Sequence, residues 1–130
     1  MRIKEVMKKA RTIDSNASVK QAAEAMSKHN LGSLIVVKGN KAVGILTERD
    51  ILSKVAAKDK VSSKVAVTEI MTEKIISIDP EALIDDAVYM MIKHKIKKLP
   101  VLQEGEVMGI LTSTDIMAHS DEIGQFYFFD

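Results

Sequence analysis

The residues best suited to chemistry in this sequence are a threonine and an aspartate that recur at one spacing. Thr47-x-x-Asp50 and Thr112-x-x-Asp115 both follow the same three residues, Gly-Ile-Leu. A carboxylate next to a ribose can accept hydrogen bonds from its two hydroxyls. A threonine hydroxyl and free backbone N–H groups at a helix start are suited to a phosphate. The pattern is therefore compatible with two sites for a sugar phosphate.

The same spacing also fits a purely structural role. In a capping box, the threonine at the start of a helix and the acidic residue three positions later satisfy each other's backbone N–H groups. Each turn would then stabilise its own helix without any ligand. The two roles are compatible, because the threonine can cap the helix while the aspartate faces a ligand.

The two turns end the copies of an internal repeat. At an offset of 65 positions, residues 12–51 align with residues 77–116 without a gap, and identical pairs such as Ile13/Ile78 and Met26/Met91 occur along the alignment. Copies of this length exceed most solenoid units. They predict two similar subdomains packed by a pseudo-two-fold axis.

Each copy predicts the element order β-α-β-β-α. The expected fold class is therefore mixed, α/β in the broad sense and α+β in the narrower one. A capping box at Ser18 and Gln21 starts the first helix, and the sequence Asn30-Leu31-Gly32 ends it in the style of a C-cap. Gly39 and Asn40 suit a hairpin turn at positive φ. The expected elements are strands 11–13, 33–37 and 42–46 with helices 18–29 and 47–57, and then strands 75–78, 98–102 and 107–111 with helices 82–94 and 112–119.

These elements divide the chain into four parts. We expect repeat one in residues 1–58, a linker in 59–66, repeat two in 67–119 and a tail in 120–130. The tail run Phe126–Phe129 holds four of the five aromatic residues. Such a cluster in water would be a sticky patch. We expect it to dock on the chain's own core or on a partner subunit.

Composition excludes several classes of protein. The chain has no cysteine, so disulfides and thiolate metal sites are excluded. No apolar run approaches the ~18 residues of a membrane span, and the N-terminus lacks the pattern of a signal peptide. We therefore expect a cytoplasmic protein. No nucleophile elbow or Walker loop is present, and His29, His94 and His119 have no evident co-ligands. We expect neither an enzyme nor a metal site.

The small net charge of +1 hides a split between the halves. Residues 1–65 hold 14 Lys and Arg against 6 Asp and Glu, whereas residues 66–130 hold 5 against 12, so the halves carry +8 and −7. A basic half can bind nucleic acid, but the lack of aromatics there argues against base stacking. We favour self-pairing in a two-fold homodimer, head to tail, with repeat one against the partner's repeat two.

Several short motifs in order resemble the CBS-domain family. They are Val6-Met7 and Ile70-Met71, the Thr-Ile-Asp and Ser-Ile-Asp-Pro starts, Leu99-Pro100-Val101, and both Gly-Ile-Leu-Thr turns. Two copies in tandem look like a free-standing Bateman module. The resemblance implies a regulatory, energy-sensing module that binds AMP, ADP or ATP, and sometimes S-adenosylmethionine, in the cleft between the repeats. Such modules commonly pair into flat dimers and act on a separate partner protein.

The resemblance also implies roles for individual residues. Thr47 with Asp50, and Thr112 with Asp115, would contact phosphate and ribose, while apolar residues of the first strand and the Pro-Val strand would sandwich the base. The candidates for contact with the base are Ile13, Ile78 and Pro100. Beside the second turn (Thr112–Asp115, turn two), Lys97 or Lys98 could meet a phosphate, and the first turn (Thr47–Asp50, turn one) has the uncharged Gly32 and Ser33 at the equivalent positions. Turn one instead carries Arg49, where turn two has Thr114. These differences predict unequal affinities. The alternative functions are a ligand-free scaffold and nucleic-acid binding.

Overall fold

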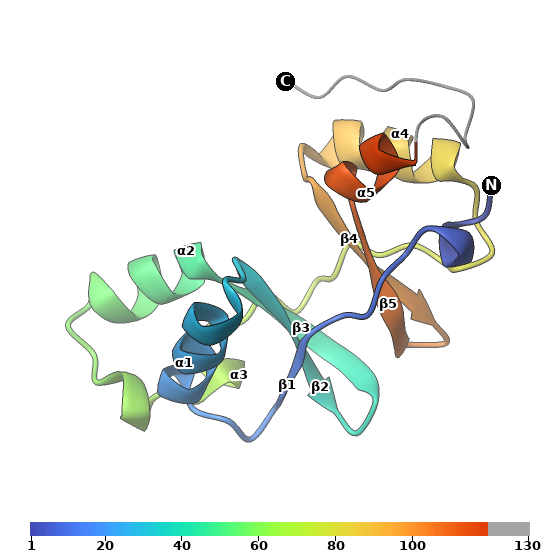
Figure 1. Cartoon of the computed structure of the whole chain (residues 1–130). Coiled ribbons are helices and arrows are strands. Elements are labelled where there is room, and N and C mark those ends of the chain that lie inside the picture. Colours follow the sequence, from blue (N-terminus) through green and yellow to red (C-terminus); the bar gives the residue numbers. More distant parts are fainter. Residues whose placement is uncertain (120–130) are drawn as a thin grey trace. The chain divides into compact units, whose positions relative to one another are not determined.

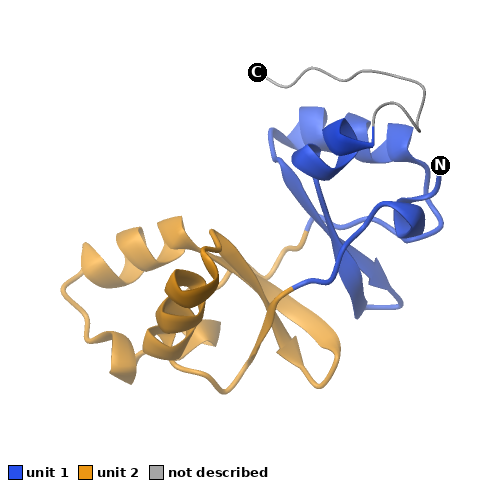
Figure 2. Ribbon diagram, in the orientation of Figure 1, with its two compact units in different colours: residues 1–10, 76–130 blue, residues 11–75 orange. Residues whose placement is uncertain are grey.

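The chain folds into two compact units. The computed structural model describes residues 1–119 of the 130, so the prediction for the tail Phe126–Phe129 lies outside the described residues. Unit 2 is Arg11–Ile75, and unit 1 joins Met1–Ala10 to the chain from Ile76 onward (Figure 2). The mixed α+β fold class is as expected. The units differ from the sequence repeats, because the segment that precedes each copy (residues 1–10 before copy one and residues 67–75 before copy two, the leading segments) packs with the other copy.

Unit 2 is a three-stranded sheet with helices (Figure 1). Its strand β2 pairs in parallel with β1 and antiparallel with β3. A short helix after β3 continues as a π-helical turn, so the predicted helix 47–57 is divided in two. The elements are β1 (Thr12–Asp14), α1 (Val19–His29), β2 (Ser33–Lys38), β3 (Lys41–Thr47), α2 (Glu48–Ile51), η2 (Leu52–Ala56), η3 (Ser62–Lys64) and α3 (Val67–Ile70).

Unit 1 contains an antiparallel hairpin and two main helices. Within the part of the chain that the structure describes, its elements are η1 (Ile3–Glu5), α4 (Ile84–His94), β4 (Lys98–Gln103), β5 (Glu106–Thr112) and α5 (Ser113–Ala118). Helix α4 begins two residues later than predicted. The Asp86 carboxylate accepts a hydrogen bond from the backbone N–H of Leu83 at 3.0 Å, which closes the helix start.

The predicted strand 75–78 is wrong as a regular element. Ile78 alone forms a parallel bridge, to Val101. In unit 2 the backbone N–H of Ile35 donates to the carbonyl of Arg11 at 3.3 Å. Pro100 stands at the position equivalent to Ile35, and proline has no N–H to donate. The ladder in unit 1 is therefore one hydrogen bond shorter.

The local turn signals predict some of the observed turns correctly and others only in part. The Ser18–Gln21 capping box is confirmed, with the Gln21 N–H donating to Ser18 Oγ at 3.1 Å. Asn30 ends α1 at a φ of 53°. In the first hairpin Gly39 has a φ of 65°, but Asn40 is not among the positive-φ residues, so that part of the prediction is wrong. A two-residue turn can need positive φ at its first central residue only.

The core of each unit is a cluster of aliphatic and methionine side chains. Leu46 and Leu111, which are equivalent in the repeat, are fully buried and immediately precede the threonines that end β3 and β5. Around them lie Val19, Ala22, Met26, Leu34, Val36 and Val67 in unit 2, and Ile3, Ile84, Ala87, Met91, Leu99 and Ile116 in unit 1. No described helix has the length and apolar character to cross a bilayer.

In each unit a leading segment forms backbone hydrogen bonds with the strand that ends at the Thr–Asp turn, which is β5 in unit 1 and β3 in unit 2. Lys8 and Ile110 exchange backbone hydrogen bonds of 3.0 and 2.8 Å in unit 1. Thr72 and Ile45 exchange bonds of 2.8 and 2.9 Å in unit 2. A Cβ added at Gly109 would lie 2.7 Å from the carbonyl oxygen of Lys8, so this close approach requires glycine.

Replacing Gly109 by alanine is therefore expected to cost about 1–3 kcal/mol in the free energy of unfolding, because the backbone must shift. Gly44→Ala should cost less, since the nearest atoms to its Cβ belong to the flexible side chain of Met71. Urea unfolding of both variants against the parent measures the difference. Equal stability of Gly109→Ala and the parent would show that the Lys8 segment does not lie there.

Candidate functional site

The turn in unit 2 is a closed capping box. Asp50 Oδ2 accepts hydrogen bonds from the backbone N–H and the hydroxyl of Thr47, both at 3.0 Å. The N–H of Asp50 donates to Thr47 Oγ1 at 3.2 Å. The other carboxylate oxygen, Oδ1, lies 3.1 Å from Lys54 Nζ. The aspartate is therefore held from both sides by groups of its own unit.

The turn in unit 1 repeats this arrangement. Asp115 Oδ2 accepts from the backbone N–H of Thr112 at 2.9 Å and from its hydroxyl at 2.8 Å. The N–H of Asp115 donates to Thr112 Oγ1 at 3.1 Å. Here Oδ1 lies 2.9 Å from Nζ of Lys8, which comes from the N-terminal segment. The two carboxylates thus have equivalent partners from different parts of the chain.

The backbone N–H groups expected to be free for a phosphate already have partners. Besides the two N–H groups inside each box, Glu48 donates to the carbonyl of Gly32 at 3.0 Å, and Ser113 donates to that of Lys97 at 2.9 Å. The expectation of free donors is therefore wrong for these groups, because the preceding loop covers the helix start. Recognition of an anion through these particular N–H groups would require them to leave their present partners.

The structure brings the predicted strand-entry residues beside the turns. Ser33 pairs with Thr47 in the register of β2 and β3, and Lys98 pairs with Thr112 in that of β4 and β5. Gly32 and Lys97 are joined to the turns by the hydrogen bonds just described. Lys97 and Lys98 are exposed, so their charges are available to a ligand of unit 1.

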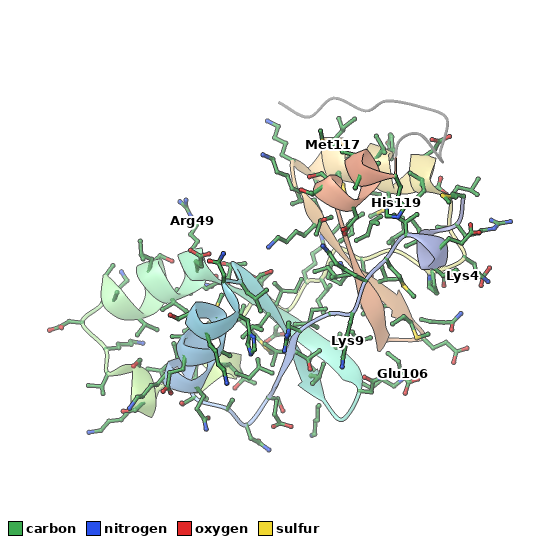
Figure 3. All side chains as sticks on the ribbon, viewed as in Figure 1. Lys4, Lys9, Arg49, Glu106, Met117 and His119 are labelled. Carbon is green, nitrogen blue, oxygen red and sulfur yellow. The ribbon has the colours of Figure 1, made fainter. Side chains whose placement is uncertain are left out.

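The other predicted residues take different positions. Ile13 is half-buried on β1 opposite Val36. Ile78 is buried, and its N–H donates to the carbonyl of Pro100 at 3.0 Å, which places the two apolar residues side by side. Arg49 and Thr114 are exposed, and Arg49 projects outward from α2 (Figure 3). Each set of candidates therefore lies within one unit.

Sequence reasoning missed the two lysines that pair with the turn aspartates. Lys54 lies four positions after Asp50, a spacing at which opposite charges meet on a helix. That signal was readable from the sequence. Lys8 and Asp115 are far apart in the sequence, so no local pattern indicates their contact. His119, at the end of α5 (Figure 3), has Nδ1 2.9 Å from the backbone oxygen of Asp115.

The environment of Asp115 changes its acidity. Burial raises the pKa of this carboxyl, but hydrogen bonds from Lys8 and Thr112 together with the charge of Lys8 outweigh it, and the pKa lies below its ordinary 3.8. A carboxylate whose pKa is lower in the folded state stabilises the fold at pH values above its unfolded pKa. That contribution is lost as the pH falls through the folded pKa.

Asp115→Asn is therefore expected to flatten the acid side of the stability curve. The free energy of unfolding, measured by urea at pH values from about 5 down to 3, should fall less steeply in Asp115→Asn than in the parent. The control is Asp59→Asn, which makes the same change at an exposed carboxylate. Identical slopes for the parent and Asp115→Asn would contradict the stabilising role of the ionised carboxylate.

Among residues 1–119, no group of three or more His, Asp and Glu is placed to hold a metal ion. Every buried side-chain nitrogen and oxygen in that part of the chain has a hydrogen-bond partner. The chemistry available at the turns is therefore polar binding through two carboxylates, two threonine hydroxyls and nearby cations.

Comparison with known proteins agrees with the repeat. The family model described as CBS domain matches residues 3–57 and again 67–122. The CBS domain-containing protein YhcV of Bacillus subtilis is 30% identical over 105 residues, which cover 81% of this chain and 74% of YhcV. The chain spans only 50% to 65% of the next three curated relatives that it matches.

Two solved structures extend the comparison. The CBS domain pair of protein MJ0100, in complex with 5′-methylthioadenosine and S-adenosyl-L-methionine, is 34% identical with a TM-score of 0.75, over 89% of this chain and 96% of that one. A hexameric CBS-CP12 protein from bloom-forming cyanobacteria is 30% identical with a TM-score of 0.76, over 95% and 73% of the respective chains.

Proposed function

The chain belongs to the CBS-domain family as a tandem pair, and we propose that it senses adenosine-containing ligands at its two Thr–Asp turns and controls a separate partner protein. The pair is a ligand-binding regulatory module, and the matches cover CBS repeats only. AMP, ADP and ATP are the proposed ligands. S-adenosylmethionine and 5′-methylthioadenosine are the alternatives, because the CBS pair of MJ0100 binds them.

One observation carries this proposal. Both units build the same Thr–Asp turn, and in both the oxygen Oδ1 that does not close the cap has, among residues 1–119, a lysine side chain as its one partner, and that side chain is about half exposed. Such an ion pair is weak because water screens it. A ribose hydroxyl can therefore replace the lysine at Oδ1 while Oδ2 continues to cap the helix.

Ligand control of a partner requires two arrangements of the protein. A ligand shifts their populations only by the difference in its affinity for them. We propose that an adenosine ligand, by displacing Lys8 or Lys54 from its aspartate, favours a different arrangement of the chain around the turn. The partner protein would bind one of the two arrangements.

A thermal-shift screen tests the proposed function. A ligand that binds only the folded state at one hundred times its Kd stabilises it by about 2.7 kcal/mol, which raises the midpoint by several degrees in a chain of this size. The screen contains AMP, ADP, ATP, NAD, S-adenosylmethionine and 5′-methylthioadenosine, with guanosine monophosphate as the control for the base. A midpoint that no adenosine ligand moves would refute the proposal.

A ligand-free scaffold is the second candidate. It is favoured by the fact that, across the described residues, all buried side-chain polar atoms are already satisfied within the protein. Capping boxes and ion pairs then account for both aspartates without a ligand. The same screen separates the two functions, since the scaffold predicts one midpoint under all conditions.

We also propose that the chain forms a two-fold homodimer, with the basic residues of one copy facing the acidic residues of the other. The charges of +8 and −7 on the two halves support head-to-tail pairing. Sedimentation at low and high salt measures the mass of the assembly, and cross-linking gives the orientation. Cross-links that join repeat one to repeat one of the partner would exclude the head-to-tail arrangement.

A further inference from the structure

Each turn aspartate uses its two carboxylate oxygens for different purposes. Oδ2 closes the capping box, as described above. Oδ1 meets an ammonium group, at 3.1 Å from Lys54 Nζ in Asp50 and at 2.9 Å from Lys8 Nζ in Asp115. Oδ1 is therefore the oxygen that a ligand hydroxyl can occupy without opening the cap. A ligand group that replaces the ammonium at Oδ1 leaves the lysine in need of a new partner.

The two lysines reach equivalent oxygens from unrelated places in the chain. Lys54 lies one helical turn beyond Asp50, whereas Lys8 lies on the segment that pairs with Ile110. At the repeat offset the position of Lys54 is taken by His119, whose ring contacts the backbone of Asp115 and not its carboxylate. In the leading segments, Thr72 pairs with Ile45 as Lys8 pairs with Ile110, so the position of Lys8 is taken by Thr72. The two lysines therefore do not descend from one position of the repeat. Their common feature is that each places a cation beside Oδ1 of a turn aspartate.

Both ammonium groups remain accessible. The side chains of Lys54 and Lys8 are 46% and 59% exposed, while those of their aspartates are 12% exposed. An ammonium has three donors, so each can face the carboxylate and water at once. Lys54 Nζ also donates to the carbonyl of Ile70 at 2.9 Å, which keeps it near the turn when Oδ1 is taken.

We propose that Lys54 and Lys8 are exchangeable contacts that select anionic adenosine ligands at the two turns. The proposal rests on the proposed function, since it needs ribose at Oδ1. When a ribose hydroxyl takes that oxygen, the displaced ammonium pairs with an anionic group of the same ligand, such as the phosphate of AMP. A neutral adenosine offers no such group, so its binding leaves the lysine without its partner.

A purely structural lysine makes a different prediction. If Lys54 and Lys8 only neutralise a mostly buried carboxylate and fix its position, their removal should weaken every adenosine ligand equally. If they bind the ligand's anion, their removal should weaken AMP alone. The ratio of affinities for AMP and for neutral 5′-methylthioadenosine therefore separates the two roles, because both ligands share the adenosine.

The experiment is calorimetry of the full chain with AMP and with 5′-methylthioadenosine. Lys54→Met and Lys8→Met keep the apolar stem and remove the charge. Each is expected to weaken AMP about tenfold at its own turn, the effect of losing one charge-assisted hydrogen bond. The affinity for 5′-methylthioadenosine should be unchanged or higher. Lys54→Arg and Lys8→Arg should keep the preference for AMP.

Matched controls are exposed lysines close to each site. Lys9→Met adjoins Lys8, and Lys58→Met follows Lys54 by one helical turn. Neither control should change the ratio of affinities. If a methionine variant fails to fold, Lys54→Gln or Lys8→Gln replaces it. Circular-dichroism melting of every variant confirms that the folded protein is titrated.

The calorimetric results separate the role of the two lysines from the proposed function. An equal loss of both ligands, or an unchanged ratio in both methionine variants, would overturn the proposal that the lysines contact the ligand's anion, and it would leave the proposed function intact. A parent protein that binds neither AMP nor 5′-methylthioadenosine would overturn the proposed function itself. A fall in the ratio at either turn, reversed by arginine, would support the exchange.

Discussion

Calorimetry of Asp115→Ala with AMP is expected to show one binding event where the parent shows two, and Asp50→Ala is expected to lose the other event. Hydrogen bonds to a charged group contribute about 1.5–3 kcal/mol each. A ribose that donates both hydroxyls to Oδ1, the oxygen that does not close the cap, therefore loses roughly a hundredfold or more in affinity when that carboxylate is removed. No substitution elsewhere at the turns removes as much of the proposed contact with the ligand.

The alanine variants also remove a cap, so the cap needs its own control. Loss of a capping side chain costs about 0.5–2 kcal/mol of stability. Thr112→Ala and Thr47→Ala remove the hydroxyl that donates to Oδ2 and accepts from the aspartate N–H, but they keep the carboxylate and the backbone N–H bond to it. If AMP binding depends mainly on the carboxylate, these variants should be destabilised like the aspartate variants but should still show both binding events, with the event at the altered turn weakened by the loss of the hydroxyl contact.

The contrary result is equally clear. If both aspartate variants bind AMP as tightly as the parent, the carboxylates do not contact ribose, and the turns are helix caps only. If the threonine variants lose binding as completely as the aspartate variants, the cap and not the carboxylate creates the site. Unequal affinities in the parent would follow from Lys97 and Lys98, which are exposed beside turn two where turn one has Gly32 and Ser33.

The fold was predictable from the sequence where local signals determine structure. The Ser18 capping box, the left-handed Asn30 and the alternation of hairpin and helix all follow from residues a few positions apart. The missing strand near Ile78 was also readable in principle, because a proline at position 100 removes the donor that Ile35 supplies in the other unit. The repeat concealed this difference, since similarity elsewhere suggested identical elements.

Contacts between distant segments were beyond the reach of sequence patterns. The pairing of Lys8 with Ile110 puts the N-terminal segment in the unit of the second copy. The Lys8–Asp115 ion pair depends on this exchange, so no spacing rule predicts it. The turns themselves were predicted with both of their roles. The structure shows the capping role, and the ligand-binding role stays a prediction.

The cores beneath the turns give the largest expected effect on stability. Leu111→Ala and Leu46→Ala each remove a fully buried side chain at equivalent places in the repeat. Buried leucine-to-alanine changes cost about 2–5 kcal/mol, because transfer free energy is lost and a cavity remains. A marginally stable chain of this size has about 5–15 kcal/mol in total. Urea unfolding should therefore show a large shift of the midpoint for either variant.

The matched control is Leu52→Ala, since Leu52 is 69% exposed on η2. A surface substitution of this kind should change the free energy of unfolding by no more than about 0.5 kcal/mol. A cost below about 1 kcal/mol for Leu111→Ala would contradict the packing of β5 against α4 and α5. Because Leu111 precedes Thr112 on β5, its loss should also loosen turn two. We therefore expect the AMP event that depends on Asp115 to weaken in Leu111→Ala even where the variant is fully folded, while Leu46→Ala weakens the event that depends on Asp50.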